Sequence, residues 1–122
     1  IYAIRKHFGI DLSDDAIAMS SGFPWGLGGG GCICGALAGG TMCIGYFFGR
    51  TTPGDSKITR CFELTNEFHD YFKEATCCRI LTKGMERNSP ERKAQCNRFV
   101  ELTVKKIAEI LIRELKKDEE SK

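Results

Sequence analysis

The feature that most constrains this chain is an uncharged, glycine-rich stretch from Gly22 to Gly49. A glycine-rich loop leads into an apolar segment, residues 32–48, whose small residues recur at three- and four-residue spacing: Gly35, Ala36, Gly39 and Gly40. On a helix such residues form a face that neighbouring helices can approach closely. Because each glycine inside a helix costs about 1 kcal/mol relative to alanine, several of them indicate close packing or approach to a site. The stretch therefore predicts a central, buried helix.

A membrane-spanning helix is an alternative interpretation of the same segment. Its 17 uncharged residues, Cys32 to Phe48, lie at the lower limit for a spanning helix, and Gly35 and Gly39 form a Gly-x-x-x-Gly pair. The segment is short, however, and the segments on either side are amphipathic, as expected of helices that cover it. We interpret it as a buried helix and expect no membrane span. Its small-residue face also suits self-association, so a homodimer stays an alternative.

Helical periodicity continues on both sides of this segment. Residues 58–75 carry apolar side chains at helical spacing, and Ser89-Pro90 is a helix start before a long apolar stripe. No stretch shows the alternation of a strand. We therefore predict an all-α, single-domain bundle of about five helices around the central Gly/Ala-rich helix, over residues 1–122. The first helix is expected to be truncated at its N-terminus, and residues 116–122 to form a charged tail.

Charge and motifs argue against nucleotide-binding functions. The 18 basic and 16 acidic side chains give a net charge of +2 and are intermingled, so nucleic acid is not an expected partner. Residues 26–31 match the Gly-x-Gly-x-x-Gly fingerprint of dinucleotide-binding folds. That fingerprint requires a preceding strand within a βαβ unit, and here a helix end precedes it. Dinucleotide binding is therefore not favoured.

Seven cysteines are many for a domain of 122 residues, which is large enough to need no disulfide staples. The odd number also leaves at least one cysteine unpaired. This excess suggests thiol chemistry or metal ligation in a reducing compartment, so we expect a cytoplasmic location.

Three cysteines lie where reactivity is favoured. Cys34 lies in the first turn of the central helix, where free backbone N–H groups and the helix dipole favour a thiolate, so we expect it to be the most nucleophilic. Cys78 lies at a helix boundary beside Arg79, and Cys96 is expected to point inward from the last helix. An antiparallel arrangement of helices would bring the three sulfurs to one end of the bundle. Two further cysteines are expected to pack as small hydrophobic residues: Cys43 and Cys61.

The order of these residues resembles the C_GCAxxG_C_C family of redox-active proteins, which has a Cys-Gly-Ala-x-x-Gly motif and four family cysteines. The run Cys34-Gly35-Ala36-Leu37-Ala38-Gly39, the later Cys78-Arg79-Ile80-Leu81 and Cys96 carry this resemblance, which covers essentially the whole chain. It implies a small helical protein that is redox-active or holds an iron-sulfur centre. It also implies a further family cysteine upstream of the part that matches residues 2–8.

We therefore expect a thiol-based redox or electron-transfer protein, a candidate oxidoreductase, with Cys34, Cys78 and Cys96 as its catalytic centre. These residues would either exchange disulfides with a redox protein partner or small-molecule oxidant, or hold an iron-sulfur cluster or zinc ion. Cys32 or the upstream cysteine would then be the fourth metal ligand. Three small residues are assigned to the cofactor-binding surface: Gly35, Ala36 and Gly39. The alternative is a non-catalytic helical accessory or metal-binding module of a transport or redox complex, whose cysteines serve packing alone.

Overall fold

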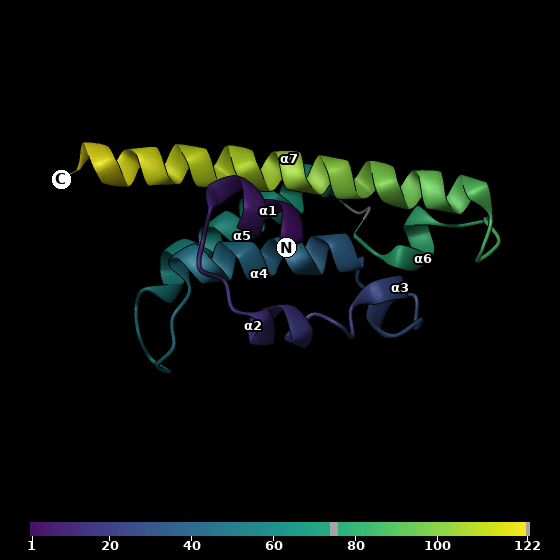
Figure 1. Ribbon diagram of the computed structural model, residues 1–122, viewed down its shortest axis with the longest axis horizontal. Helices are drawn as coiled ribbons and strands as arrows, with labels where there is room; N and C mark the ends of the chain where they lie inside the picture. Colours follow the sequence, from purple (N-terminus) through teal and green to yellow (C-terminus); the bar gives the residue numbers. More distant parts are fainter. Residues whose placement is uncertain (74–75, 122) are drawn as a thin grey trace.

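The computed structural model describes residues 1–73 and 76–121, and within these it contains seven helical segments and no β-strand. In chain order the helices are α1 (Tyr2–Phe8), α2 (Asp14–Met19), α3 (Pro24–Leu27), α4 (Gly35–Phe48), α5 (Ile58–Phe72), α6 (Cys78–Leu81) and α7 (Pro90–Glu120) (Figure 1). The predicted all-α bundle is confirmed. The two segments beyond the five expected helices, α3 and α6, have four residues each.

Local signals in the sequence determine several helix ends. The Ser13 hydroxyl accepts a hydrogen bond from the N–H of Ala16, and the Ser89 hydroxyl accepts one from Arg92, each at 3.2 Å. Both serines thus cap the starts of α2 and α7, since they satisfy N–H groups that have no partner inside the helix. The helix start predicted at Ser89-Pro90 is confirmed. Gly9 ends α1 with a left-handed backbone, φ 58°, as glycine allows.

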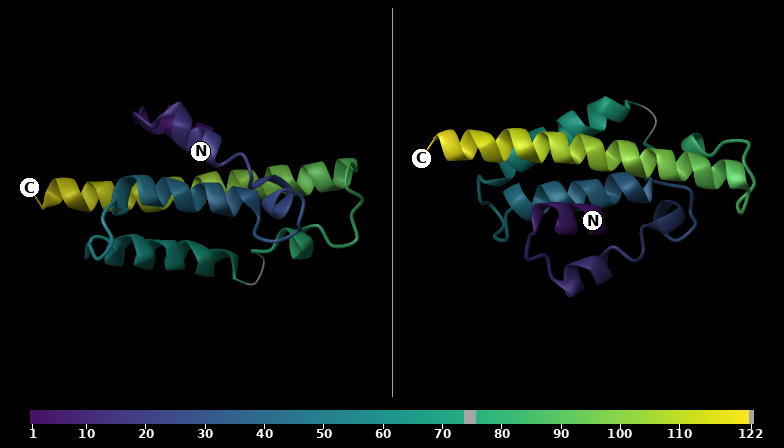
Figure 2. Two further views of the ribbon diagram at one scale, coloured as in Figure 1. Left: turned by 90° about the horizontal axis from the view of Figure 1, so that it is seen from below. Right: turned by 45° about the horizontal axis from the view of Figure 1, so that its top comes forward.

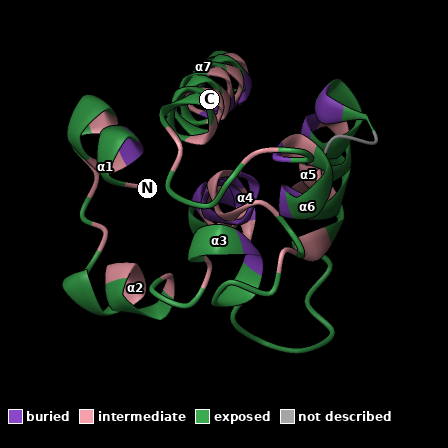
Figure 3. Cartoon of the chain, turned by 90° about the vertical axis from the view of Figure 1, so that its right-hand side faces the viewer, coloured by how far each residue is buried: buried purple, intermediate pink, exposed green. Residues whose placement is uncertain are grey.

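Helix α4 is the centre of the bundle. Seen end-on, it lies between α7, α5 and the α1 side of the molecule (Figure 3), and its side chains join those of α5 and α7 in one core. Gly40 is required at the closest contact, because a Cβ atom there would lie 2.8 Å from Cζ of Phe68 and 3.1 Å from Cγ1 of Ile107. The predicted use of small residues for close helix packing is therefore confirmed at this position.

The predicted boundaries need corrections. Helix α4 begins at Gly35 and not at Cys32, because Ile33 instead pairs in an antiparallel bridge with Cys77. Phe62, expected on the apolar stripe of α5, is 72% exposed. The charged tail continues α7 as far as Glu120, and Lys122 lies outside the described residues, as does Ala75 of the α5 stripe.

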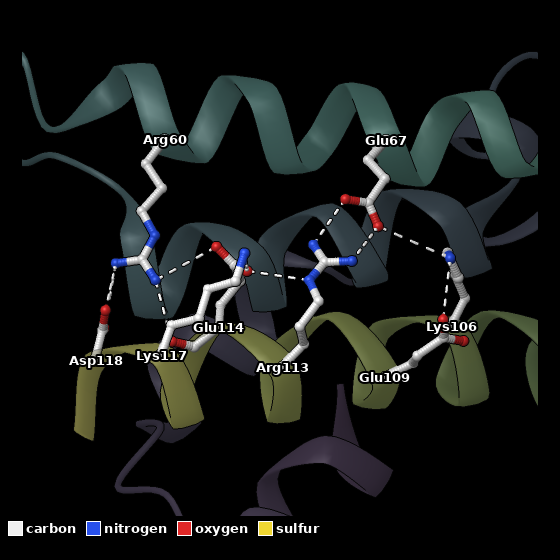
Figure 4. A network of polar contacts seen from close by, with 8 residues as sticks. All are labelled: Arg60, Glu67, Lys106, Glu109, Arg113, Glu114, Lys117 and Asp118. Carbon is white, nitrogen blue, oxygen red and sulfur yellow. Dashed lines mark hydrogen bonds and ion pairs between the residues drawn. The ribbon is translucent and has the colours of Figure 1, made fainter. Parts of the chain in front are cut away.

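A network of charged side chains holds α5 against α7 (Figure 4). Arg113 binds both carboxylate oxygens of Glu67, at 2.7 and 2.8 Å. Arg60 reaches from α5 to the buried Glu114, at 3.5 Å, and to Asp118, at 3.0 Å. Seen from below, α5 lies alongside α7, and in the second view it crosses behind α7 (Figure 2). The network therefore joins the two helices where they pass each other.

Within the described parts of the chain, no helix is both long and apolar enough to cross a lipid bilayer. For these described residues, the expectation of no membrane-spanning helix is confirmed.

Candidate functional site

A cavity of about 600 Å³ is lined by residues of α1, α2, α3, α4, α6 and α7, and four cysteines are among them. Three of these are the predicted catalytic cysteines, which come from separate parts of the chain. Cys34 comes from the start of α4, Cys78 from the start of α6 and Cys96 from the first part of α7. The small residues of the motif also line it: Gly35, Ala36 and Gly39. The structure thus brings together the predicted catalytic cysteines and the predicted cofactor-binding residues. We call this space the cysteine cavity.

Backbone pairing between residues 31–34 and 76–79 brings Cys34 towards Cys78. The N–H of Cys34 donates to the carbonyl of Thr76 at 2.9 Å, and the N–H of Cys78 donates to the carbonyl of Cys32 at 2.6 Å. The thiol of Cys77 donates to the carbonyl of Gly31 at 3.0 Å. Two segments more than 40 residues apart are therefore fixed in register, which the sequence does not predict.

Gly26 allows the glycine-rich loop to pack directly on Cys78. It is buried, with φ 72°, and a Cβ atom there would lie 2.8 Å from Cβ of Cys78 and 2.6 Å from the nitrogen of Cys32. No L side chain fits this place without displacing one of the two cysteines. The apparent nucleotide fingerprint at residues 26–31 thus forms part of the wall beside the cysteines, outside any βαβ unit.

The pKa of Cys34 is raised, which is opposite to the direction expected from its place at a helix start. Burial raises the pKa most, and the backbone N–H groups of Leu37 and Ala36 lower it. Negative charge on Cys78 or Cys96 raises the pKa of Cys34 further, so Cys34 lies within electrostatic range of both. The helix-end effect is therefore present but weaker than the loss of solvation. Cys34 is mostly a neutral thiol at neutral pH.

A positive charge approaches Cys78 instead. The guanidinium of Arg92 donates from Nη2 to the sulfur of Cys78, 3.7 Å away, and its Cζ lies 5.0 Å from the centroid of the Trp25 ring. A second guanidinium, that of Arg87, lies over the same ring at 4.4 Å. Sequence analysis missed all three of these residues. The single tryptophan within the glycine-rich loop was the one available signal.

The remaining cysteines differ in their surroundings. Cys96 was expected to point inward, and it does line the cavity, although the residue as a whole is exposed. Cys32 is exposed and does not line the cavity. Cys43 is buried, as predicted, and its thiol forms part of the cavity wall, while Cys61 is half-buried in α5 away from it. Cys34, Cys78 and Cys96 therefore line one cavity, where Cys96 is exposed, Cys34 is half-buried and Cys78 is buried.

The cysteines do not form a ready metal site in this conformation. All seven have free thiols, and within residues 1–73 and 76–121 no three or more His, Cys, Asp or Glu side chains are grouped so that they could hold a metal ion. The set considered from the sequence, Cys34, Cys78, Cys96 and Cys32, thus lacks the convergence that an iron-sulfur cluster or zinc requires. No chemical step through a metal is derived for it.

Comparison with curated proteins and with solved structures found no match. The profile of one protein family, described as "Putative redox-active protein (C_GCAxxG_C_C)", matches residues 1–110. The family label writes Gly before Cys, whereas in this chain Cys34 precedes Gly35. The matched region contains the whole cysteine cavity, with Cys34, Cys78 and Cys96. The chain therefore belongs to the C_GCAxxG_C_C family of redox-active proteins.

Proposed function

We propose that this protein is a thiol-disulfide oxidoreductase that works through the cysteine cavity. The observation that carries the proposal is that Cys34, Cys78 and Cys96, from three separate elements, line one cavity next to a guanidinium that contacts a sulfur. Thiolates attack disulfides and thiols do not. The contact with Arg92 therefore favours Cys78 as the first nucleophile, in place of Cys34. A reducing, cytoplasmic environment would keep the resting thiols reduced.

In the proposed reaction the thiolate of Cys78 attacks a disulfide R–S–S–R, forms a mixed disulfide and releases one thiolate, RS⁻. Cys34 then attacks the sulfur of Cys78, which releases the second R–S group, and the proton of Cys34 passes to a departing thiolate. The substrate disulfide gains two electrons and becomes two thiols, the second of which takes up from solvent the proton that Cys78 lost when it ionised. The protein becomes the Cys34–Cys78 disulfide. A dithiol or low-molecular-weight thiol of the cell returns the protein to its reduced form.

The test is a reaction of the reduced protein with bis(2-hydroxyethyl) disulfide, an uncharged substrate. We expect two substrate thiols to be released for each protein disulfide formed, and mass mapping to find that disulfide between Cys34 and Cys78. In Cys34→Ser the mixed disulfide on Cys78 should accumulate, because the resolving thiol is gone. Cys61→Ser is the matched control, since this thiol does not line the cavity. It should behave as the parent protein does.

Two results would contradict the proposal. If Cys78→Ser and Cys34→Ser both reacted as fast as Cys61→Ser and gave no trapped adduct, the cysteines would serve packing, as in an accessory module. If the protein purified anaerobically carried iron and acid-labile sulfide that was lost in Cys34→Ser and Cys78→Ser, the same thiolates would hold a cluster.

A further inference from the structure

A second cavity, of about 480 Å³, adjoins the cysteine cavity and lies between the glycine-rich loop, α6 and the start of α7. Four positively charged side chains line it: Arg79, Lys83, Arg87 and Arg92. We call it the basic cleft. The two cavities share Trp25, Cys78, Arg87 and Arg92 as lining residues. A molecule bound in the basic cleft would therefore lie next to Cys78.

The cations of the basic cleft have no acidic partner. Among the described residues, none of the four forms an ion pair, and no Asp or Glu lines either cavity, although the chain has 16 acidic residues. Like charges repel each other more strongly near a protein than in bulk water. Four of them around one space therefore favour the binding of an anion.

The guanidinium groups are already held in place. Arg87 and Arg92 both lie over the Trp25 ring, and Arg79 donates from Nη2 to the carbonyl of Gly30 at 3.0 Å. Glycine at position 29 permits the approach of Arg87, because a Cβ atom there would lie 3.0 Å from its Nη2. Less conformational entropy is lost when an anion binds to groups that are ordered in advance. The fork of arginine donors also matches carboxylate and phosphate oxygens.

The cysteine cavity offers a different surface. Its walls include apolar side chains such as Ile17 of α2, Phe23 directly before α3, and Val104 and Ile107 of α7. The buried hydroxyl of Thr103 also lines it and has no hydrogen-bond partner among the described residues. An apolar cavity with a few polar groups at its edge is typical of a small-molecule site. A ligand that occupies both spaces would combine an apolar body with an anionic end.

We infer that the two cavities together bind a small molecule with a phosphate or carboxylate head in the basic cleft and an apolar body in the cysteine cavity. The inference deepens the proposed function and rests on it for the identity of the substrate, which would be a low-molecular-weight disulfide that carries such a head. The anionic head would be bound by Arg79, Lys83 and Arg87. This orientation places the apolar part of the ligand among the three cysteines.

Calorimetric titration of the reduced protein tests the inference with unreactive probes: octyl phosphate, octanoate, octanol and inorganic phosphate. We expect octyl phosphate or octanoate to bind, and the tighter of the two identifies the head group. Octanol and inorganic phosphate each lack one half of the ligand, so they should bind at least about tenfold more weakly than the better octyl probe. Fluorescence of Trp25, the only tryptophan, should change upon binding, because the residue lines both cavities.

Charge variants identify the site. Lys83→Gln and Arg87→Gln should each weaken binding of the better probe by about tenfold, because each removes a charged donor. Arg98→Gln removes the same charge from α7 outside both cavities, and binding should stay within about twofold. The inference is wrong if neither octyl probe binds, if octanol binds equally well, or if Arg98→Gln weakens binding as much as Arg87→Gln does.

Two assays on the parent protein separate this inference from the proposed function. Calorimetry with the octyl probe reports on the ligand site alone, and disulfide exchange with bis(2-hydroxyethyl) disulfide, which carries no anionic head, reports on the thiols alone. If the parent protein bound the probe but did not exchange disulfides, the ligand site would be supported and only the redox proposal would be contradicted. Disulfide exchange without probe binding would overturn only the ligand site.

Discussion

The guanidinium of Arg92 lies 3.7 Å from the sulfur of Cys78 and stacks on the Trp25 ring at the boundary between the two cavities. Arg92 comes from the first turn of α7, which Ser89 caps through the N–H of Arg92 itself. A helix start that the sequence specifies thus determines where this positive charge lies. Cys78 depends on that position for its electrostatic environment.

We predict that Arg92→Gln slows the alkylation of Cys78 by iodoacetamide at pH 7 by about threefold to tenfold, because a nearby cation favours the reactive thiolate. Peptide mapping by mass spectrometry measures the rate at each cysteine. Arg98→Gln, the control with the same loss of charge, should leave the rate unchanged. An equal effect of both variants would show that net charge matters and that the contact with the sulfur does not.

We predict that the alkylation of Cys34 has its pH midpoint above that of an unstructured cysteine peptide, about 8.5. Burial raises the pKa of this thiol, so the folded protein holds the proton where the free peptide has lost it. The rate at Cys34 is measured across pH 6 to about 10 by quantitative mass spectrometry. A midpoint at or below that of the peptide would restore Cys34 as the first nucleophile.

We predict that Gly40→Ala destabilises the protein by about 1–3 kcal/mol, because the added methyl group collides with Phe68 and Ile107 in a packed core. Urea unfolding followed by circular dichroism measures the change. The matched control is Gly45→Ala in the same helix, where a Cβ atom meets nothing within 4 Å. That variant should be neutral or up to about 1 kcal/mol more stable, because alanine favours the helix.

We predict that the ion pair between Glu67 and Arg113 stabilises the protein by about 1 kcal/mol at most, since both side chains are more than one-third exposed. The hydrogen bonds from Arg113 lower the pKa of Glu67 in the folded state. The unfolded chain therefore binds more protons at acid pH. The stabilisation is complete above the unfolded pKa of glutamate, about 4.3, and is lost as the pH falls through the folded pKa.

A double-mutant cycle with Glu67→Gln and Arg113→Gln measures this coupling by urea unfolding at neutral and acid pH. The control is Glu63→Gln on the same helix, an exposed residue that forms no ion pair within the described chain. A coupling that did not decrease on acidification would contradict the assignment of the pH dependence to Glu67.

The sequence by itself determined the five predicted helices and several of their ends, because the signals for them are local. The caps at Ser13 and Ser89, the glycine at position 9 and the apolar periodicity act within a few residues. The spacing of the small residues of α4 is also a local pattern, and it predicted a central helix. The family motif, read together with the later cysteines, also identified three of the four cysteines that line the cavity: Cys34, Cys78 and Cys96.

Only the tertiary structure decided how those thiols behave. Pairing of residues 31–34 with 76–79 joins segments far apart in the chain, and no local pattern encodes such a contact. This pairing keeps Cys32 outside α4. It also places Cys34 where burial raises the pKa of its thiol more than the N–H groups at the helix start lower it. The approach of Arg92 to Cys78 arises in the same way, from the packing of α7 against α6 and the loop. Desolvation and charge proximity depend on these distant neighbours, so the reactivity of each thiol is a property of the folded protein.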